Sequence, residues 1–144
     1  FRAQIKLAIK YKLPIVIHAR NSFDEIFEIV DQENCDDLKG VFHCFTGSTE
    51  QAQHIINYKG FKMGIGGVVT FKNAGLDKVV AKIPLEHLVL ETDCPYLPPV
   101  PHRGKRNESS YLQLIADKIS DIHEVSVDQV AKITTANATE LFGL

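Results

Sequence analysis

Short apolar runs alternate with amphipathic segments along the whole chain. Four runs rich in β-branched residues have the length of strands, and the segments between them repeat apolar residues every three or four positions, as helices do. The expected strands are 14–18, 40–44, 61–65 and 87–92. The expected helices are 1–12, 23–32, 50–58, a short one near 74–82, 108–123 and 126–141.

This order, a helix followed by strand–helix units, predicts an α/β fold with a parallel sheet and right-handed crossovers. The periodicity fits an open doubly wound sheet and part of a β/α barrel equally well. Both architectures place active sites at the C-terminal ends of their strands. Neither a linker nor a repeat divides the chain, so we expect residues 1–144 to form a single domain.

Polar side chains stand at the C-terminal ends of three expected strands. His18 ends the first, His43 ends the second and Asp93 follows the fourth. Because side chains alternate along a strand, Glu91 and Asp93 share a face, and two inward carboxylates need a cation, hydrogen-bond donors or a proton nearby. Two imidazoles and a carboxylate suit Zn²⁺, Mn²⁺ or Mg²⁺. A lone histidine is more often a core or surface residue, but three equivalent placements favour a site.

Arg20 follows His18 by two residues, at an expected strand-to-helix turn. Its guanidinium is suited to bind a phosphate or carboxylate with two hydrogen bonds. A surface ion pair with Asp24 or Glu25 is an equally good interpretation of the same position.

A proline-rich loop after the fourth strand ends in a basic stretch that contains Arg103. This stretch is suited to contact phosphate at the mouth of a site, although such charge runs are usually only solvated. The glycine-rich segment 64–67 lacks the spacing of a dinucleotide-binding loop. Its backbone freedom would let Thr70 and Lys72 reach the site.

Composition adds few constraints. The 144 residues are 44% hydrophobic and 24% charged, and the net charge of −2 gives no global attraction to polyanions, so such attraction has to be local. The apolar runs are too short to span a bilayer, and no signal-peptide pattern is present. Three cysteines without a CxxC motif fit buried thiols in a reducing, cytoplasmic compartment. The alternative is that Cys44 or Cys94 is reactive or binds metal, but strand alternation would turn Cys44 away from His43. An opening without methionine suggests N-terminal truncation.

Several stretches together resemble the TatD family of metal-dependent hydrolases. The matching segments are PIVIHAR at 14–20, GVFHCFTG at 40–47, GVVTFK at 67–72, LETDCPYL at 90–97, PHRGKRNE at 101–108 and NATELFGL at 137–144. The resemblance implies a (β/α)₈ TIM-type barrel with a two-metal site at its C-terminal face. Such barrels need about 250 residues, so this chain would be the C-terminal half, with the N-terminal half missing.

The resemblance also implies roles for particular residues. His18 and His43 would bind one metal and Asp93 the other, which are three ligands of six. The family's His-x-His motif and fourth-strand glutamate lie in the part that this chain lacks. Asp93 would also accept a proton from water, and Glu91 would orient a histidine ligand. The residues implied to contact substrate phosphate are Arg20, Arg103 and Lys72.

The implied activity is hydrolysis of DNA phosphodiester bonds with two divalent ions (Mg²⁺, Mn²⁺ or Zn²⁺). One alternative is a metal-dependent ester or amide hydrolase, such as an aminoacyl-tRNA deacylase. Another is an inactive half-barrel that lacks half of its metal ligands. Because four strands leave two sheet edges unpaired, we expect the chain to bind the missing half or to self-associate. DNA is the expected partner, and no membrane contact is expected.

Overall fold

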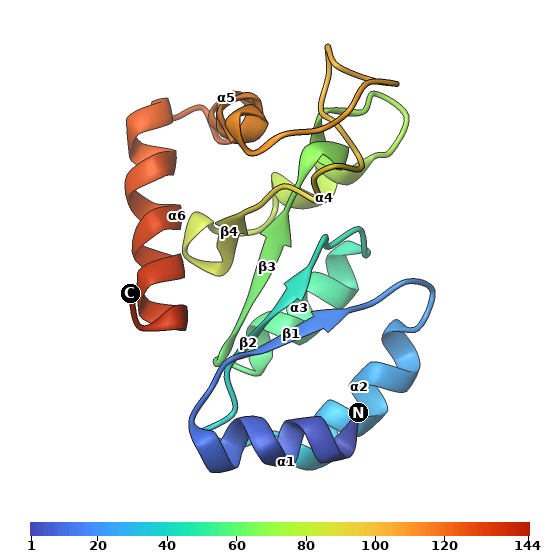
Figure 1. Ribbon diagram of the computed structural model, residues 1–144, viewed down its shortest axis with the longest axis vertical. Coiled ribbons are helices and arrows are strands. Elements are labelled where there is room, and N and C mark those ends of the chain that lie inside the picture. The colour runs from blue at the N-terminus through green and yellow to red at the C-terminus, as the bar shows by residue number, and fades with distance from the viewer.

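Four parallel strands form the centre of the structure, a computed structural model that describes residues 1–144 (Figure 1). The strands are β1 (Ile15–His18), β2 (Gly40–His43), β3 (Phe61–Ile65) and β4 (Leu88–Leu90). They lie in the order β1-β2-β3-β4, and each neighbouring pair is parallel. The predicted α/β class with a parallel sheet is therefore confirmed.

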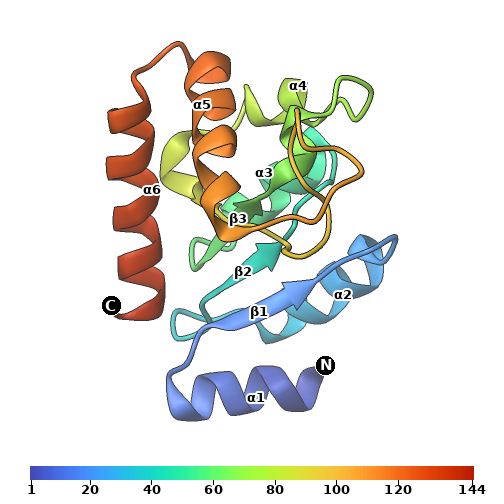
Figure 2. The same ribbon diagram turned by 45° about the horizontal axis from the view of Figure 1, so that its top comes forward.

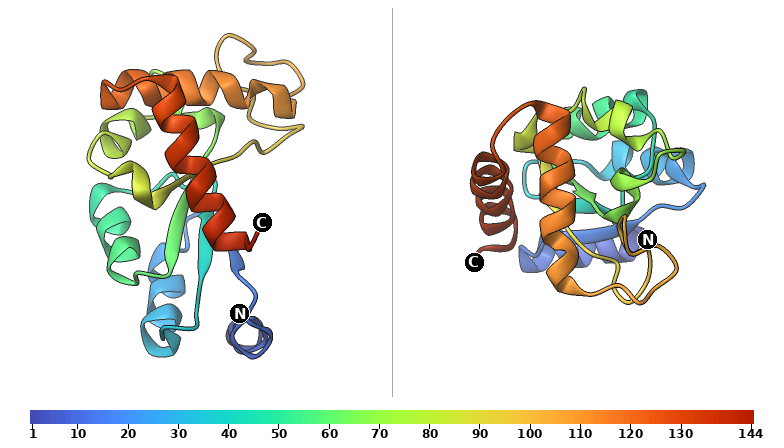
Figure 3. Two further views of the ribbon diagram at one scale, coloured as in Figure 1. Left: turned by 90° about the vertical axis from the view of Figure 1, so that its left-hand side faces the viewer. Right: turned by 90° about the horizontal axis from the view of Figure 1, so that it is seen from above.

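Helices connect and cover the strands. They are α1 (Arg2–Tyr11), α2 (Phe23–Glu33), α3 (Thr49–Asn57), α4 (Leu76–Val80), α5 (Leu112–His123) and α6 (Val127–Phe142). Figure 3 shows α2, α3 and α4 along one side of the sheet. Helix α1 lies beside β1 at one end of the sheet, whereas α5 and α6 pack together at the β4 end (Figure 2).

The two faces of the sheet differ in burial. The face toward α2 and α3 carries Ile17 and Phe42, both buried, and Phe42 packs against aromatic rings of α2. On the opposite face Val16 is 59% exposed, although it lies within a strand. Farther along this face, Val41 and Val89 are buried beneath Leu141 of α6. The part of this face near β1 is therefore the least covered apolar part of the sheet.

Strand β4 is shorter than the expected 87–92. A 3₁₀ turn over Leu85–His87 precedes it, so His87 does not belong to the strand. The ladder continues past Leu90 through a single hydrogen bond from the backbone N–H of Glu91 to the carbonyl of Ile65, at 3.1 Å. Glu91 and Asp93 therefore lie just beyond the strand, where the backbone turns into the proline-rich loop.

The expectation of buried thiols is wrong for two of the three cysteines. All three are free, but Cys35 and Cys94 are exposed and only Cys44 is half-buried. The first two lie in loops, outside the helices and strands. None of the helices has the length and apolar character needed to cross a membrane.

Candidate functional site

The ring of His43 lies between two carboxylates at the C-terminal edge of the sheet. Its Nδ1 atom is 3.0 Å from Oε2 of Glu91, and its Nε2 atom is 3.4 Å from Oδ1 of Asp93. Both carboxylates reach the same ring, as expected for residues on one face. The side chains of His43 and Glu91 are about one-fifth exposed, and Asp93 is 38% exposed. The site is thus shielded on the Glu91 side and open on the Asp93 side.

Electrostatics at this ring follow from the two carboxylates. Burial lowers the pKa of His43, but the hydrogen bond and charge of Glu91, helped by Asp93, outweigh it and raise the pKa overall. A carboxylate only accepts hydrogen bonds, so Nδ1 carries a proton and donates it to Glu91. Nε2 of His43 and the facing oxygen of Asp93 are then the atoms left to bind cations. Imidazole nitrogen and carboxylate oxygen fit Zn²⁺ and Mn²⁺, and Mg²⁺ less well.

Cys44 departs from the expected strand alternation, which would turn its side chain away from the site. Strand β2 ends at His43, and Cys44 has a φ of 48°, so the alternation stops before it. Its thiol lines the same hollow as His18 and Asp93. Burial, followed by the charges of Glu91 and Asp93, raises the thiol pKa to about 11, so the thiol stays protonated at neutral pH.

The backbone N–H of Cys44 donates a hydrogen bond to Oε1 of Glu91. This contact could not be predicted from the sequence, because a backbone donor carries no residue-specific pattern. With the imidazole of His43 on Oε2, both oxygens of Glu91 are held by donors from the end of β2. Glu91 is therefore fixed relative to β2 although it belongs to the segment after β4.

His18 lies beside His43, since the two are register partners on β1 and β2, with ring centroids 5.9 Å apart. It is exposed and lines an open hollow of about 470 Å³ with Asp93. Within the chain, no group of three or more His, Cys, Asp or Glu side chains is arranged to hold a metal ion. The structure thus brings His43 and Asp93 into direct contact and places His18 next to them, and the assignment of His18 as a ligand stays a prediction.

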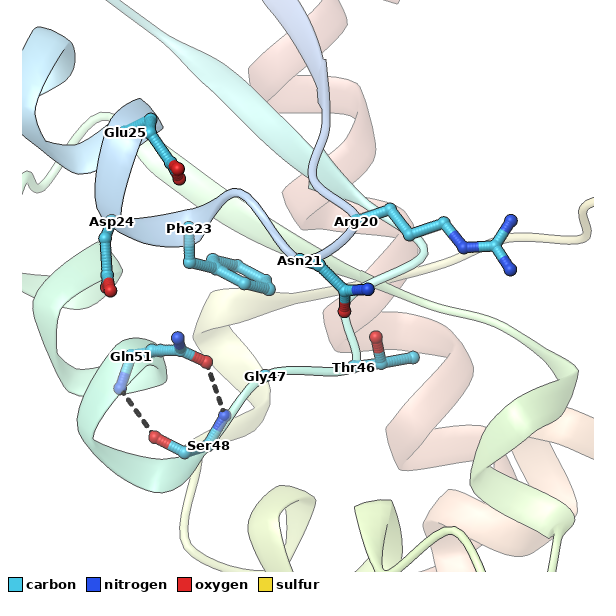
Figure 4. Close-up of a pocket in the computed structure, with 9 residues that line it drawn as sticks. All are labelled: Arg20, Asn21, Phe23, Asp24, Glu25, Thr46, Gly47, Ser48 and Gln51. Atoms are coloured by element: carbon cyan, nitrogen blue, oxygen red, sulfur yellow. Dashed lines mark hydrogen bonds between the residues drawn. The ribbon is translucent and has the colours of Figure 1, made fainter.

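Arg20 does not form the surface ion pair that was one interpretation of its position. It is in none of the salt bridges, and its guanidinium points away from Asp24 and Glu25 (Figure 4). Arg20 lines the hollow of His18 and Asp93, and a second hollow of about 400 Å³ toward the start of α3. It is therefore free to bind an anion beside the carboxyl ends of β1 and β2.

The second hollow is bounded by a capped helix. Ser48 accepts a hydrogen bond from the backbone N–H of Gln51 at 3.2 Å, and the Gln51 side chain accepts one from the Ser48 backbone at 2.8 Å (Figure 4). This reciprocal pair is a capping box. It occupies two of the free amides at the start of α3, and Arg20 is the one cationic side chain that lines this hollow, together with Asp24 and Glu25.

Arg103 and Lys72 lie around a different hollow, of about 400 Å³, between the segment after β3 and the proline-rich loop. The guanidinium carbon of Arg103 is 3.7 Å from the centre of the Phe71 ring. Thr70, expected to approach the site, instead donates to the carbonyl of Gly67 and accepts from the backbone N–H of Val100. The roles of Arg103 and Lys72 toward substrate stay predictions.

Two histidines on helices outside the site are only partly exposed. The Nε2 atom of His54 is 2.9 Å from Oδ1 of Asp31 and 3.2 Å from the hydroxyl oxygen of Tyr58. The His54 ring stacks on the Phe27 ring, with centroids 4.3 Å apart. In His123 the Nε2 atom is buried without a hydrogen-bond partner, and burial lowers the pKa of this ring. Both rings pack against neighbouring elements, a contact that helical periodicity alone does not reveal.

The sequence of the chain is similar to a known protein family and to several bacterial proteins. A sequence profile described as TatD related DNase matches residues 1–143. The metal-dependent hydrolase YabD of Bacillus subtilis is 46% identical over 99% of the chain and 56% of its own length. The metal-dependent hydrolase YcfH of Escherichia coli K12 is 36% identical over 99% of the chain and 54% of its own length.

Solved structures agree with these matches. The TatD homologue YJJV of Escherichia coli K12 superposes with a TM-score of 0.91 at 30% identity, over 98% of this chain and 54% of that one. A TatD family hydrolase of Entamoeba histolytica gives a TM-score of 0.82 at 27% identity, over 98% and 55%. YabD and YcfH are described as metal-dependent hydrolases. The chain belongs to the TatD family, and it spans about half the length of the relatives that it matches.

Proposed function

We propose that the protein containing this chain is a divalent-metal-dependent deoxyribonuclease of the TatD type. The observation that carries this proposal is the ring of His43, with Glu91 on Nδ1 and Asp93 facing Nε2. A histidine held by one carboxylate and paired with another is the arrangement that fixes a metal ligand in many metalloenzymes. The relative YabD is described as a metal-dependent hydrolase, which supports the metal-dependent chemistry. The description of the family profile as TatD related DNase supports DNA as the substrate.

Three residues of this chain would bind the metal ions, and one of them would also accept a proton. Nε2 of His43, the ring of His18 and the carboxylate of Asp93 would hold divalent cations at the edge of the sheet. When bound, such cations supply Lewis-acid activation of a phosphate and of a water molecule. Asp93 is the most exposed of the contacting side chains, so it can accept the proton of an attacking water, a role worth about 10²–10⁴-fold in rate.

The cationic side chains would bind the phosphate. Arg20 lines the hollow of His18 and Asp93 without an ion pair of its own, so its guanidinium can stabilise charge on a phosphate oxygen. Lys72, in the segment after β3, and Arg103, in the proline-rich loop, line another hollow and would contact the flanking backbone of the nucleic acid. A protein with a net charge of −2 over this chain would then attract DNA only locally.

We further propose that the four strands are the last four of an eight-stranded barrel, completed by a preceding segment of the protein. The exposed Val16 and the free edge of β1 would pair with that segment. Residues 1–144 expressed alone should therefore self-associate or bind the absent half. Light scattering tests this directly, and a monomer with a cooperative thermal transition would contradict it.

The substrate is tested with the full-length protein on single-stranded DNA and on an aminoacyl ester, each with Mn²⁺ and with excess EDTA. Release of nucleotides that EDTA abolishes is the expected result. Hydrolysis of the ester without cleavage of DNA would replace the nuclease by a deacylase. Nucleotide release that persists in EDTA would contradict metal dependence for both.

A further inference from the structure

Gly64 lies in β3, between the strand that precedes Glu91 and the strand that carries His43. A Cβ atom built on Gly64 would lie 2.5 Å from Cδ and 2.6 Å from Oε1 of Glu91, and its three nearest heavy atoms all belong to that carboxylate. Such separations are far below van der Waals contact. The side chain of Glu91 therefore crosses β3 through the space that a side chain at residue 64 would fill.

Glu91 cannot simply move aside to make room. Its Oε2 accepts from the ring of His43 at 3.0 Å, and its Oε1 accepts from the backbone N–H of Cys44. Both donors belong to the end of β2, whereas the Glu91 backbone is held to β3 through its hydrogen bond to the carbonyl of Ile65. A displaced carboxylate would lose one or both donors, and buried donors without partners are costly.

The backbone of Gly64 does not explain the glycine. Its φ is not in the left-handed region, where glycine is favoured, unlike that of Gly75 at 70°. Gly64 is buried in the middle of a four-stranded sheet, where glycine weakens a strand unless another group approaches closely. Here the approaching group is the carboxylate of Glu91.

We infer that Gly64 is a positioning residue: its missing side chain opens the path by which Glu91 reaches across β3 and sets the ring of His43. The importance of this ring for catalysis rests on the proposed function, but the contact itself does not. Glutamate is longer than aspartate, so its carboxylate can reach across the intervening strand. The missing side chain at Gly64 leaves the space for it.

The test compares Gly64→Ala with Gly66→Ala in the ¹⁵N-labelled full-length protein. Gly66 is a matched control two residues along, because a Cβ there would meet only the Glu91 carbonyl oxygen, at 3.6 Å, and its φ of −109° suits alanine. In Gly64→Ala we expect loss of the downfield amide shift of Cys44 and of the protected Nδ1 proton of His43. In Gly66→Ala both signals should stay. Their persistence in Gly64→Ala would overturn the inference.

Metal affinity gives a second readout. Mn²⁺ titration should show affinity about 10–100-fold weaker in Gly64→Ala, the usual effect of losing a carboxylate that orients a histidine ligand. Gly66→Ala should bind within twofold of the parent protein. The NMR signals are read without metal or substrate, so they test the contact even if the protein proves not to be a nuclease.

A double-mutant cycle covers the case in which Gly64→Ala folds poorly. If the carboxylate is the obstacle, Gly64→Ala should lower the thermal midpoint in the parent protein and leave it unchanged in a Glu91→Ala background. An equal fall in both backgrounds would mean that residue 64 needs glycine for another reason, and the inference would be wrong.

Discussion

The Nδ1 atom of His43 and the Oε2 atom of Glu91 are 3.0 Å apart, and this contact joins the end of β2 to the segment after β4 across the intervening strand. It fixes which ring nitrogen is free to bind a cation. It also favours the charged form of the His43 ring, which burial alone would disfavour. The relationship between these two residues thus links the geometry of the sheet to the chemistry proposed for its edge.

Glu91→Gln should weaken Mn²⁺ binding by about 10–100-fold. The carboxylate accepts from His43 with one oxygen and from the Cys44 backbone with the other, whereas an amide offers only one acceptor, so one donor would face an NH₂ group. Isothermal titration of the full-length protein measures the loss. Glu28→Gln, at an exposed position on α2, is the control. Affinity within twofold of the parent protein would contradict this role of Glu91.

Tyr58→Phe should destabilise the protein by about 0.5–1.5 kcal/mol at pH 7, the usual worth of one hydrogen bond. The Tyr58 hydroxyl donates to Asp31 at 2.6 Å and joins α3 to α2. Urea unfolding measures the change, with Tyr11→Phe as the control because Tyr11 is 59% exposed. A loss no larger than that of the control would show that the contact does not stabilise the fold.

The Tyr58 contact also predicts a pH dependence. The hydrogen bond from Tyr58 lowers the pKa of Asp31, with burial opposing and His54 assisting. Because the folded pKa lies below the ordinary value of 3.8, the stabilisation is present above that value and is lost as pH falls through the folded pKa. The difference between the parent protein and Tyr58→Phe should therefore shrink below pH 3.8. A constant difference from pH 7 to pH 3 would be inconsistent with this linkage.

Asn137→Ala should cost about 1–3 kcal/mol, because it leaves two carbonyl groups without a donor. The side-chain amide of Asn137 donates to the carbonyl of Leu85 at 2.8 Å and to that of Leu88 at 2.7 Å, and the residue is buried. These bonds tie α6 to the start of β4. Urea unfolding compares this variant with Asn57→Ala on the exposed side of α3. Equal effects of the two substitutions would show that the bonds contribute little.

The fold could be predicted from patterning because each strand is a short apolar run between amphipathic helices. The range expected for β3 agrees with the structure. Strand β4 is shorter than expected, because a 3₁₀ turn occupies its expected start and the ladder ends after the backbone hydrogen bond of Glu91. Polar residues at strand ends identified His43, Glu91 and Asp93 as neighbours, since parallel strands bring their carboxyl ends to one edge.

Other parts of the site could not be predicted, for specific reasons. The left-handed backbone of Cys44 broke the alternation on which its orientation was predicted. Gly64 was interpreted as a source of backbone freedom, because a sequence does not show which side chain crosses an empty position. The packing of His54 depends on contact between α2 and α3, which helical periodicity does not specify.

The central claim is that Asp93 is essential for metal-dependent hydrolysis of DNA. Its most direct test is the rate of Mn²⁺-dependent nucleotide release from single-stranded DNA by the full-length protein and by its Asp93→Asn variant. Circular dichroism of the same samples establishes that the fold is intact. We predict that the rate falls by at least about 100-fold with an unchanged thermal midpoint. A rate within a few-fold of the parent protein would contradict the assignment of Asp93 and the account built on it.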